Sequence, residues 1–223
     1  MAGPAPFTPV VTGLRDGSRV AIRAIAPADK QRLVDGFEKL SERSRYRRFL
    51  APVPRLSEAM LRYLTDVDHD GHEALVAIAV DEPGEPGLGV ARYIRIPGEP
   101  EVAEAAVTVI DEAQGNGLGT LLLVLLAQLA IRRGIRRFRA YVLEENTPMR
   151  DLLRSLGAEA EHDSPGLLRM DTPLPEDPET VPAGPAGEVL RAVARGDIPE
   201  VATERRTGEI EPVAADPGEA PPG

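Results

Sequence analysis

The sequence predicts an α+β fold in which helices flank one mixed sheet, because runs with strand periodicity and runs with helix periodicity follow one another in a mixed order. Apolar residues recur at every second position in "SRVAIRAIA" and in several later runs. Longer runs have helical spacing, and glycine- and proline-rich breakers bound both kinds. The predicted strands cover residues 18–26, 73–81, 87–96, 101–111, 136–144 and 166–174.

The second to fourth predicted strands are expected to lie side by side. The breaker-dense "EPGEP" between 73–81 and 87–96 predicts an antiparallel pair joined by a turn, and 101–111 adds a third neighbour. Helical spacing predicts two or three short helices within residues 26–50 and 56–66, and further helices at 117–133 and 146–158. The sheet is therefore expected to have helices between most of its other strands.

Composition limits the classes of function. The chain has 223 residues and no cysteine, which excludes a disulfide framework, a thiolate metal site and a cysteine nucleophile, and favours a cytoplasmic protein. The formal charge of -10 argues against a nucleic-acid partner. The N-terminus lacks the features of a signal peptide, and the apolar run after Thr120 is too short to span a membrane, so no membrane association is expected.

The predicted domain covers residues 18–174, after an N-terminal extension at 1–17. From Pro173 onward, eleven acidic residues stand against four arginines, so most of the net charge lies in the C-terminal segment. Residues 175–223 are rich in proline, glycine and acidic residues and predict a disordered tail. Residues 187–197 alone have the pattern of a short helix, and a docking or autoinhibitory role for the tail is the alternative.

A glycine-rich stretch, "VIDEAQGNGLGTLLL", lies between a β-rich run and the long apolar helix. A strand that enters a helix through such a loop creates an anion site, because free backbone amides and the positive end of the helix dipole face the same point. The dinucleotide pattern G-x-G-x-x-G fails in both registers, and the Walker pattern fails because no lysine follows Lys39. A glycine turn that only shapes the corner is the structural alternative.

The pattern that does match is Gln-x-x-Gly-x-Gly, at Gln114, Gly117 and Gly119. Together with the order of strands and helices, it resembles the acyl-CoA loop of the GNAT acetyltransferase superfamily, over roughly residues 18–172. The segments "LSERSRYRRFL" and "AEAAVTVIDEAQGNGLGTLLL" are most similar to the Pat-type bacterial protein lysine acetyltransferases. The resemblance implies a mixed, mostly antiparallel central sheet of about six or seven strands.

The resemblance also implies a co-substrate and the residues that hold it. Acetyl-CoA is expected to place its pyrophosphate on the loop, and its pantetheine arm along the strand backbone at Val107 and Val109. Asn146 is either a helix cap or a further contact of the cofactor. The loop residues concerned are Gln114, Gly115, Asn116, Gly117, Leu118, Gly119 and Thr120.

Glu104 is the candidate general base. Amide formation needs a neutral amine, and a carboxylate with a raised pKa can take the proton of the attacking amine. Periodicity leaves Glu104 either as a surface residue or as a partly desolvated base, and the resemblance to Pat-type enzymes favours the base. Leu153 occupies the place where many GNAT enzymes carry a tyrosine acid, so water or a thiolate leaving group is expected instead.

No metal site is expected. "DVDHDGHE" (66–73) matches the first half of a calcium loop, but the position of its closing glutamate is Ala77. The sequence therefore predicts an N-acetyltransferase that moves an acetyl group from acetyl-CoA directly to a primary amine, with a protein lysine as the expected acceptor. A small-molecule amine acetyltransferase and a non-catalytic acyl-CoA sensor are the alternatives. The sequence makes no prediction of oligomeric state.

Overall fold

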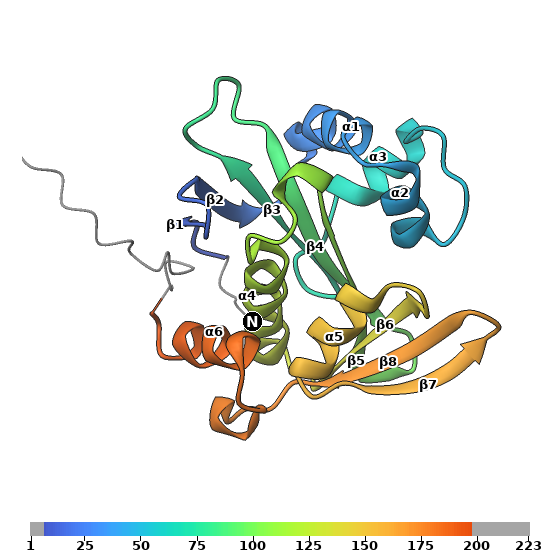
Figure 1. Ribbon diagram of the computed structural model, residues 1–223, viewed down its shortest axis with the longest axis vertical. Coiled ribbons are helices and arrows are strands. Elements are labelled where there is room, and N and C mark those ends of the chain that lie inside the picture. Colours follow the sequence, from blue (N-terminus) through green and yellow to red (C-terminus); the bar gives the residue numbers. More distant parts are fainter. Residues whose placement is uncertain (1–6, 198–223) are drawn as a thin grey trace, which may run out of the picture.

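The computed structural model describes residues 7–197 and shows one eight-stranded sheet with helices on both faces (Figure 1). The strand order is β1-β2-β3-β4-β5-β6-β8-β7, and every neighbouring pair is antiparallel except β5 and β6. The strands are β1 (Val10–Gly13), β2 (Arg19–Ala24), β3 (His72–Ala79), β4 (Gly87–Ile96), β5 (Glu99–Val109), β6 (Arg137–Leu143), β7 (Glu159–Ser164) and β8 (Leu167–Pro173). The predicted mixed, mostly antiparallel sheet is confirmed, with eight strands where six or seven were expected.

The helices divide between the two faces of the sheet. The α-helices are α1 (Lys30–Glu38), α2 (Glu42–Phe49), α3 (Glu58–Thr65), α4 (Leu118–Arg132), α5 (Thr147–Ser155) and α6 (Pro185–Ala194). Short 3-10 turns occur at Pro27–Asp29, Asp111–Ala113 and Pro178–Thr180. Figure 1 shows α1, α2 and α3 grouped at one end of the molecule, away from α4 and α6.

The sequence pattern did not predict two of the strands, β1 and β7, each for a different reason. β1 lies in the expected N-terminal extension and has only four residues, too few for a periodicity signal. β7 is exposed along its whole length, so its sequence "EAEHDS" carries no apolar alternation. It is held instead by antiparallel pairing with β8 after the turn at Gly166.

The main core lies between the sheet and α4. Alternate residues of β2 to β5 pack on this side with most of α4, which is buried nearly all round. A smaller cluster on the other face joins Ile25 and alternate residues of β3 to Leu33 of α1. Because both faces are covered, β3 is buried along almost its entire length.

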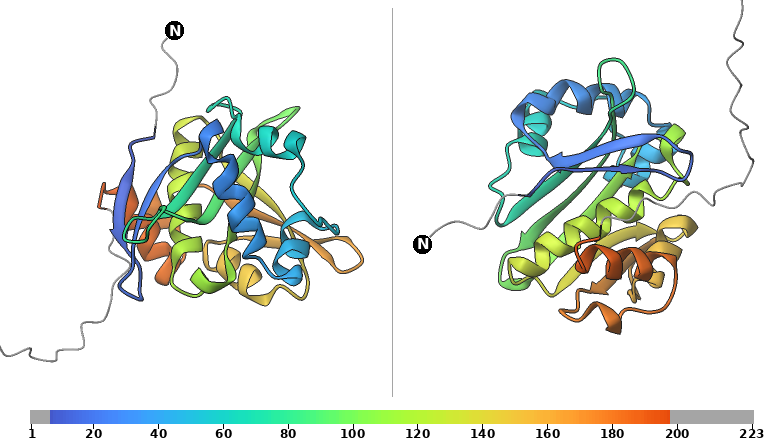
Figure 2. Two further views of the ribbon diagram at one scale, coloured as in Figure 1. Left: turned by 90° about the horizontal axis from the view of Figure 1, so that it is seen from above. Right: turned by 90° about the vertical axis from the view of Figure 1, so that its left-hand side faces the viewer.

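The packed part of the chain extends beyond the expected boundary at Leu174. α6 lies beside α4 (Figure 2), where Ala186 and Leu190 pack against Val124 and Leu156. A short helix was expected here, but within a disordered tail, and the structure differs because its apolar face finds a partner on the back of α4. The remainder of the expected tail, from 198 to 223, and residues 1–6 lie outside the described residues.

None of the helices within residues 7–197 combines the length and apolarity that a bilayer crossing needs.

Candidate active site

The central feature of the site is a split in the sheet between β5 and β6. These parallel strands pair only at Val102–Arg137, Ala103–Phe138 and Glu104–Arg139. Beyond Glu104, β5 continues against β4 as far as Val109, while β6 continues against β8 as far as Leu143. From Ala105 onward, the edge of β5 on the β6 side therefore has no paired strand within residues 7–197. Its backbone groups are available to an extended ligand, apart from Val109 O, which accepts from Gln114.

The narrow end of the split is fixed by ion pairs. Arg139 of β6 contacts Glu99 at 3.0 Å and Asp171 of β8 at 3.0 Å. Hydrogen bonds to these two carboxylates raise the pKa of the Arg139 guanidinium above its ordinary value. The three strands are thus held together at one end and free to diverge at the other.

A cleft of about 450 Å³ fills the opening. Its walls come from β5, β6, the end of β8, the loop before α4, one side of α4 and of α5, and parts of α2 and α6. The predicted residues that line it are Val107, Val109, Gln114, Gly115, Gly119 and Asn146. The structure therefore brings most of the predicted cofactor residues to one cavity.

The glycine loop forms the start of α4 as predicted. Gly115 and Gly117 have φ values of 83° and 85°, in the left-handed region that glycine alone adopts without strain. Gly117 is the N-cap of α4, and no side chain caps the helix. The first-turn amides, which have no intrahelical acceptor, therefore remain available for an anion.

Two predicted loop residues shape the loop through their side chains. Asn116 donates from Nδ2 to Asp16 Oδ2 at 2.6 Å, which anchors the loop to the β1–β2 turn. Gln114 donates from Nε2 to Val109 O at 3.0 Å and to Asp111 Oδ1 at 3.1 Å. Both side chains hold the protein's own loop in place, and the turn before β2 is a support that the sequence did not reveal.

The other residues that were predicted to contact the cofactor, Leu118, Thr120 and Asn146, lie in different environments. Leu118 is 1% exposed and belongs to the main core, so only its backbone faces the loop. Thr120 is half-buried in the first turn of α4. Asn146 occupies the N-cap position of α5, as the cap alternative expected, but its side chain makes no capping hydrogen bond, and the residue also lines the cleft.

Glu104 lies at the point where β5 and β6 separate. It is exposed, and it alternates with the α4-facing residues Ala103 and Ala105, so its side chain is on the face covered by α1 to α3. Its carboxylate acts electrostatically on Arg48 of α2 and favours the charged guanidinium. Glu104 is not among the residues that line the cleft; its carboxylate is open to solvent, next to the point where the lining of the cleft begins at Ala105.

α2 closes the cleft on the side opposite the loop. Its Ser44, Arg47 and Arg48 line the cavity, and Arg43 and Arg47 contact Glu145 at 3.4 and 3.7 Å across the mouth. Ser41, at the N-cap of α2, donates its backbone N–H to Asp111 Oδ2 at 3.1 Å. The basic cluster of residues 43–49 thus borders the cleft.

Two tyrosines on the strands around the site, Tyr93 and Tyr141, lie in different environments. Tyr141 of β6 lines the cleft, whereas Tyr93 is fully buried and donates to Asp70 O at 3.1 Å. Leu153, at the position of the missing tyrosine acid, is buried in an apolar cluster beneath α5.

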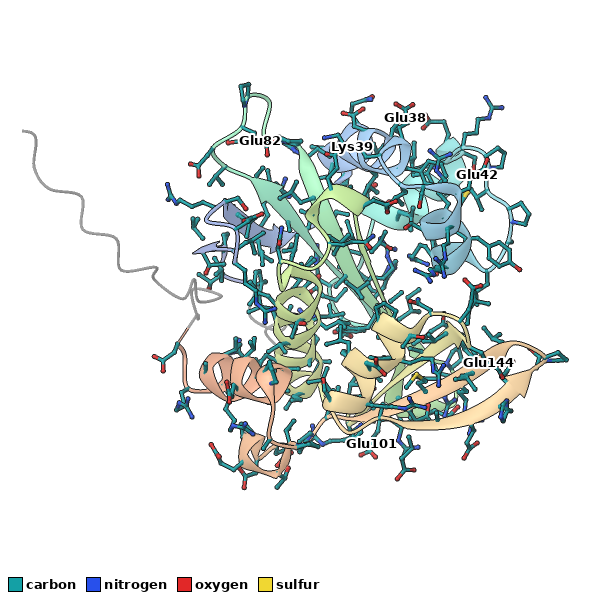
Figure 3. The ribbon with its side chains drawn as sticks, in the orientation of Figure 1. Glu38, Lys39, Glu42, Glu82, Glu101 and Glu144 are labelled. Atoms are coloured by element: carbon teal, nitrogen blue, oxygen red, sulfur yellow. The ribbon has the colours of Figure 1, made fainter. Side chains whose placement is uncertain are left out.

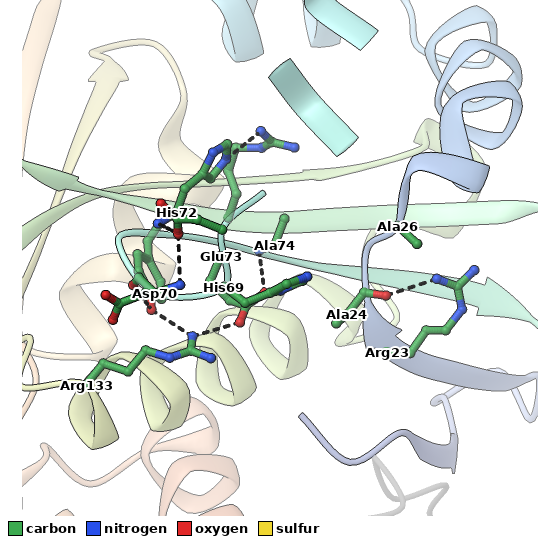
Figure 4. Close-up of polar contacts among 12 residues, drawn as sticks. Arg23, Ala24, Ala26, His69, Asp70, His72, Glu73, Ala74 and Arg133 are labelled. Carbon is green, nitrogen blue, oxygen red and sulfur yellow. Dashed lines mark hydrogen bonds and ion pairs between the residues drawn. The ribbon is translucent and has the colours of Figure 1, made fainter. Parts of the chain in front are cut away.

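The acidic loop before β3 has a structural role. Asp68 Oδ1 accepts from the backbone of Asp70 and His72, and buried Glu73 contacts Arg133 at 2.7 Å and His69 at 2.8 Å (Figure 4). Arg133, at the C-terminal end of α4, is therefore an internal ion-pair partner. No group of three potential metal ligands occurs within residues 7–197.

The split sheet and the glycine loop are the features by which the chain can be compared with known acyltransferases. The chain belongs to the GNAT acetyltransferase family: the model of the "Acetyltransferase (GNAT) domain" matches residues 19–159. This membership confirms the resemblance inferred from the loop, and with it acetyl-CoA as the family's acyl donor.

Named relatives narrow the comparison. The chain is 33% identical over 198 residues to Acetyltransferase Pat of Mycolicibacterium smegmatis, a match that covers 85% of this chain but only 58% of that protein. It is 36% identical over 154 residues to Acetyltransferase PA5475 of Pseudomonas aeruginosa, covering 69% of this chain and 82% of the relative. The crystal structure of the GNAT domain of S. lividans PAT superposes with a TM-score of 0.68 at 34% identity, over 74% of this chain and 97% of that domain.

Proposed function

We propose that the chain transfers an acetyl group from acetyl-CoA directly to a primary amine, and that this amine is the side chain of a protein lysine. The unpaired edge of β5 beside the glycine loop carries the proposal, because it offers an extended arm and a diphosphate adjacent binding sites. The similarity to proteins named Pat supports a protein acceptor.

Each step of the reaction is assigned to groups along the cleft. The amides of Gln114 to Thr120 hold the pyrophosphate, and the backbone at Val107 and Val109 holds the pantetheine arm and polarises the thioester carbonyl. Glu104 takes the proton of the amine as its nitrogen attacks the carbonyl carbon. Transfer is direct because the chain has no cysteine to form an acyl-enzyme, and Leu153 leaves no tyrosine at the usual position of the acid.

The proposal includes a cytoplasmic location, because the chain has no cysteine to form the disulfides that are common in secreted proteins. Arg48, which interacts electrostatically with Glu104, and Arg92, which interacts with Arg48, disfavour strongly cationic acceptors such as polyamines and aminoglycosides. A lysine side chain carries a single charge, which the same arginines help to remove by lowering the pKa of the bound ammonium.

The test is release of CoA from acetyl-CoA in the presence of lysine peptides and folded proteins. Glu104→Gln is expected to lower kcat/KM by about 10²–10⁴-fold, the range for loss of a general base. Glu101→Gln is the matched control, because Glu101 is an exposed glutamate on the same strand but lies at the closed end of the β5–β6 pairing, whereas Glu104 lies at the end where the strands separate. Equal turnover by both variants would refute the role of Glu104, and absence of release with every acceptor would favour the sensor alternative.

A further inference from the structure

Two arginines meet at a second cavity, on the opposite face of the sheet from α4. This cavity, of about 80 Å³, lies between helices α1 to α3 and strands β3 to β5, and both Arg48 of α2 and Arg92 of β4 line it. Arg92 is 5% exposed and donates to Leu64 O at 2.7 Å, and its Nη1 lies 3.2 Å from His72 Nε2. Arg48 packs its guanidinium over the ring of Phe49, 5.1 Å from the centroid.

Within residues 7–197, neither guanidinium forms a salt bridge with a carboxylate. Arg32, at the other end of the cavity, is paired with buried Asp29 at 3.2 Å. Glu104 of β5 favours the charged form of Arg48 but forms no salt bridge with it. The acidic side chains Glu38 and Glu42 on α1 and α2 point outward and are exposed (Figure 3). Burial lowers the pKa of Arg92 to about 9, with a further contribution from the nearby charge of Arg48.

The second cavity adjoins the cofactor cleft. Arg48, Ala106 and Thr108 line both spaces, so the two meet beside the free edge of β5. Thr108 Oγ1 is buried and has no hydrogen-bond partner within the described residues. Most of the other lining residues are apolar, including Phe37, Leu40 and Phe49.

These groups match the chemistry of a carboxylate. Guanidinium groups bind carboxylates through short, charge-assisted hydrogen bonds, and a free hydroxyl adds one more donor. Arg92 is buried and Arg48 is half-buried, so their two positive charges are costly without an ion-pair partner, and an anionic group would offset that cost. An ammonium or a polyamine would increase it.

We propose that this cavity binds a carboxylate that a substrate carries into the active site, an inference that rests on the proposed function. The carboxylate comes either from an acyl group that ends in one, as in succinyl-CoA, or from an acidic residue beside the acceptor lysine. With succinyl-CoA the amine nitrogen forms the new C–N bond, the C–S bond breaks, the proton passes to Glu104 and CoA leaves as the thiolate. The transfer itself is thus the same as for acetyl-CoA.

The test measures binding in two arms by titration calorimetry. The donor arm compares the Kd of succinyl-CoA with that of acetyl-CoA, and the acceptor arm compares lysine peptides that carry Glu or Gln beside the lysine, in the presence of CoA. Arg48→Gln is expected to weaken the carboxylate-bearing ligand at least about tenfold more than its neutral counterpart in one arm, which identifies the source. Arg48→Lys keeps the charge but not the planar fork, so an intermediate loss is expected.

Arg43→Gln is the control, since Arg43 is an exposed arginine on the same helix and is absent from the walls of both cavities. Equal effects of Arg48→Gln on charged and neutral ligands in both arms would overturn the proposal. Both arms measure binding, so an absence of CoA release with every acceptor refutes the proposed function without deciding whether the cavity binds a carboxylate. Circular dichroism and melting temperature identify any variant that fails to fold, and in that case the comparison of charged with neutral ligands is made with Arg48→Lys.

Discussion

Gly119 offers the sharpest test of the diphosphate site, because a side chain can be added there without disturbing the fold. Its backbone lies outside the left-handed region, and an added Cβ would meet nothing closer than Val109 Cγ2 at 3.7 Å, an ordinary contact. Gly115 and Gly117, by contrast, have positive φ values and would be strained by any side chain. Substitution of Gly119 by Asp therefore tests charge alone, with Gly119→Asn as the neutral control of similar size.

The expected magnitude follows from the position of Gly119 in the first turn of α4. Without ligand, an aspartate there interacts favourably with the helix dipole by about 0.3–1 kcal/mol, so unfolding stability should stay level or rise. With CoA bound, the introduced carboxylate repels each negative charge of the diphosphate. At a separation of about 5 Å, each such pair weakens binding by about 1–3 kcal/mol, for an effective dielectric constant between those of water and a protein surface. A Kd increase of about a hundredfold is then the central expectation.

The assay is a thermal or denaturant titration with CoA at about a hundredfold excess over the wild-type Kd. Ligand stabilisation should fall from about 2.7 kcal/mol to about 0.4 kcal/mol in the Asp variant, while the Asn variant keeps most of it. The difference between the two variants should shrink as salt is added. Equal losses for Asp and Asn, or full stabilisation of the Asp variant, would refute a diphosphate site at the start of α4.

Two further predictions concern the support of the site. Gly187→Ala should lower the melting temperature, because the added Cβ would collide with Pro182 O and displace α6 from α4, at a cost of about 1–3 kcal/mol in stability. Glu188→Ala, at an exposed position on the same helix, is the control. An unchanged melting temperature for Gly187→Ala would contradict the packing of α6 on α4. Asp29→Asn should lower the free energy of unfolding by about 3–5 kcal/mol at pH 7, because it removes one partner of a buried ion pair. Burial works to raise the pKa of Asp29, but hydrogen bonds from Arg23 hold that pKa below 3.8. The wild-type advantage is present above pH 3.8 and should decline as the pH falls below it. Urea unfolding from about pH 7 to about pH 3 measures this decline, and a constant gap between wild type and variant would contradict it.

Local sequence was sufficient to predict the parts of the site that depend only on the backbone geometry of neighbouring residues. Alternating glycines between a strand and an apolar helix allow few structures other than a turn that exposes first-turn amides, and Gly115 and Gly117 have the positive φ values that such a turn requires. Similarly, "EPGEP" between two β-rich runs was enough to place β3 and β4 as an antiparallel pair. These features were predictable because every group involved lies within a few residues along the chain.

The second cavity depends instead on register between elements that are distant in sequence. Arg48 lies in a run of four arginines on α2, and nothing in that run distinguishes it from Arg43 or Arg47. It becomes different because α2 crosses the free edge of β5, where the neighbouring strand β4 presents Arg92 opposite Ala106. Sequence patterns were enough to nominate the base on this face but not the two cations beside it, and these cations bear most directly on which substrates the cleft accepts. A carboxylate-bearing substrate is favoured at this site for the same electrostatic reason that a polyamine is disfavoured, so one substitution, Arg48→Gln, should shift both preferences in opposite directions.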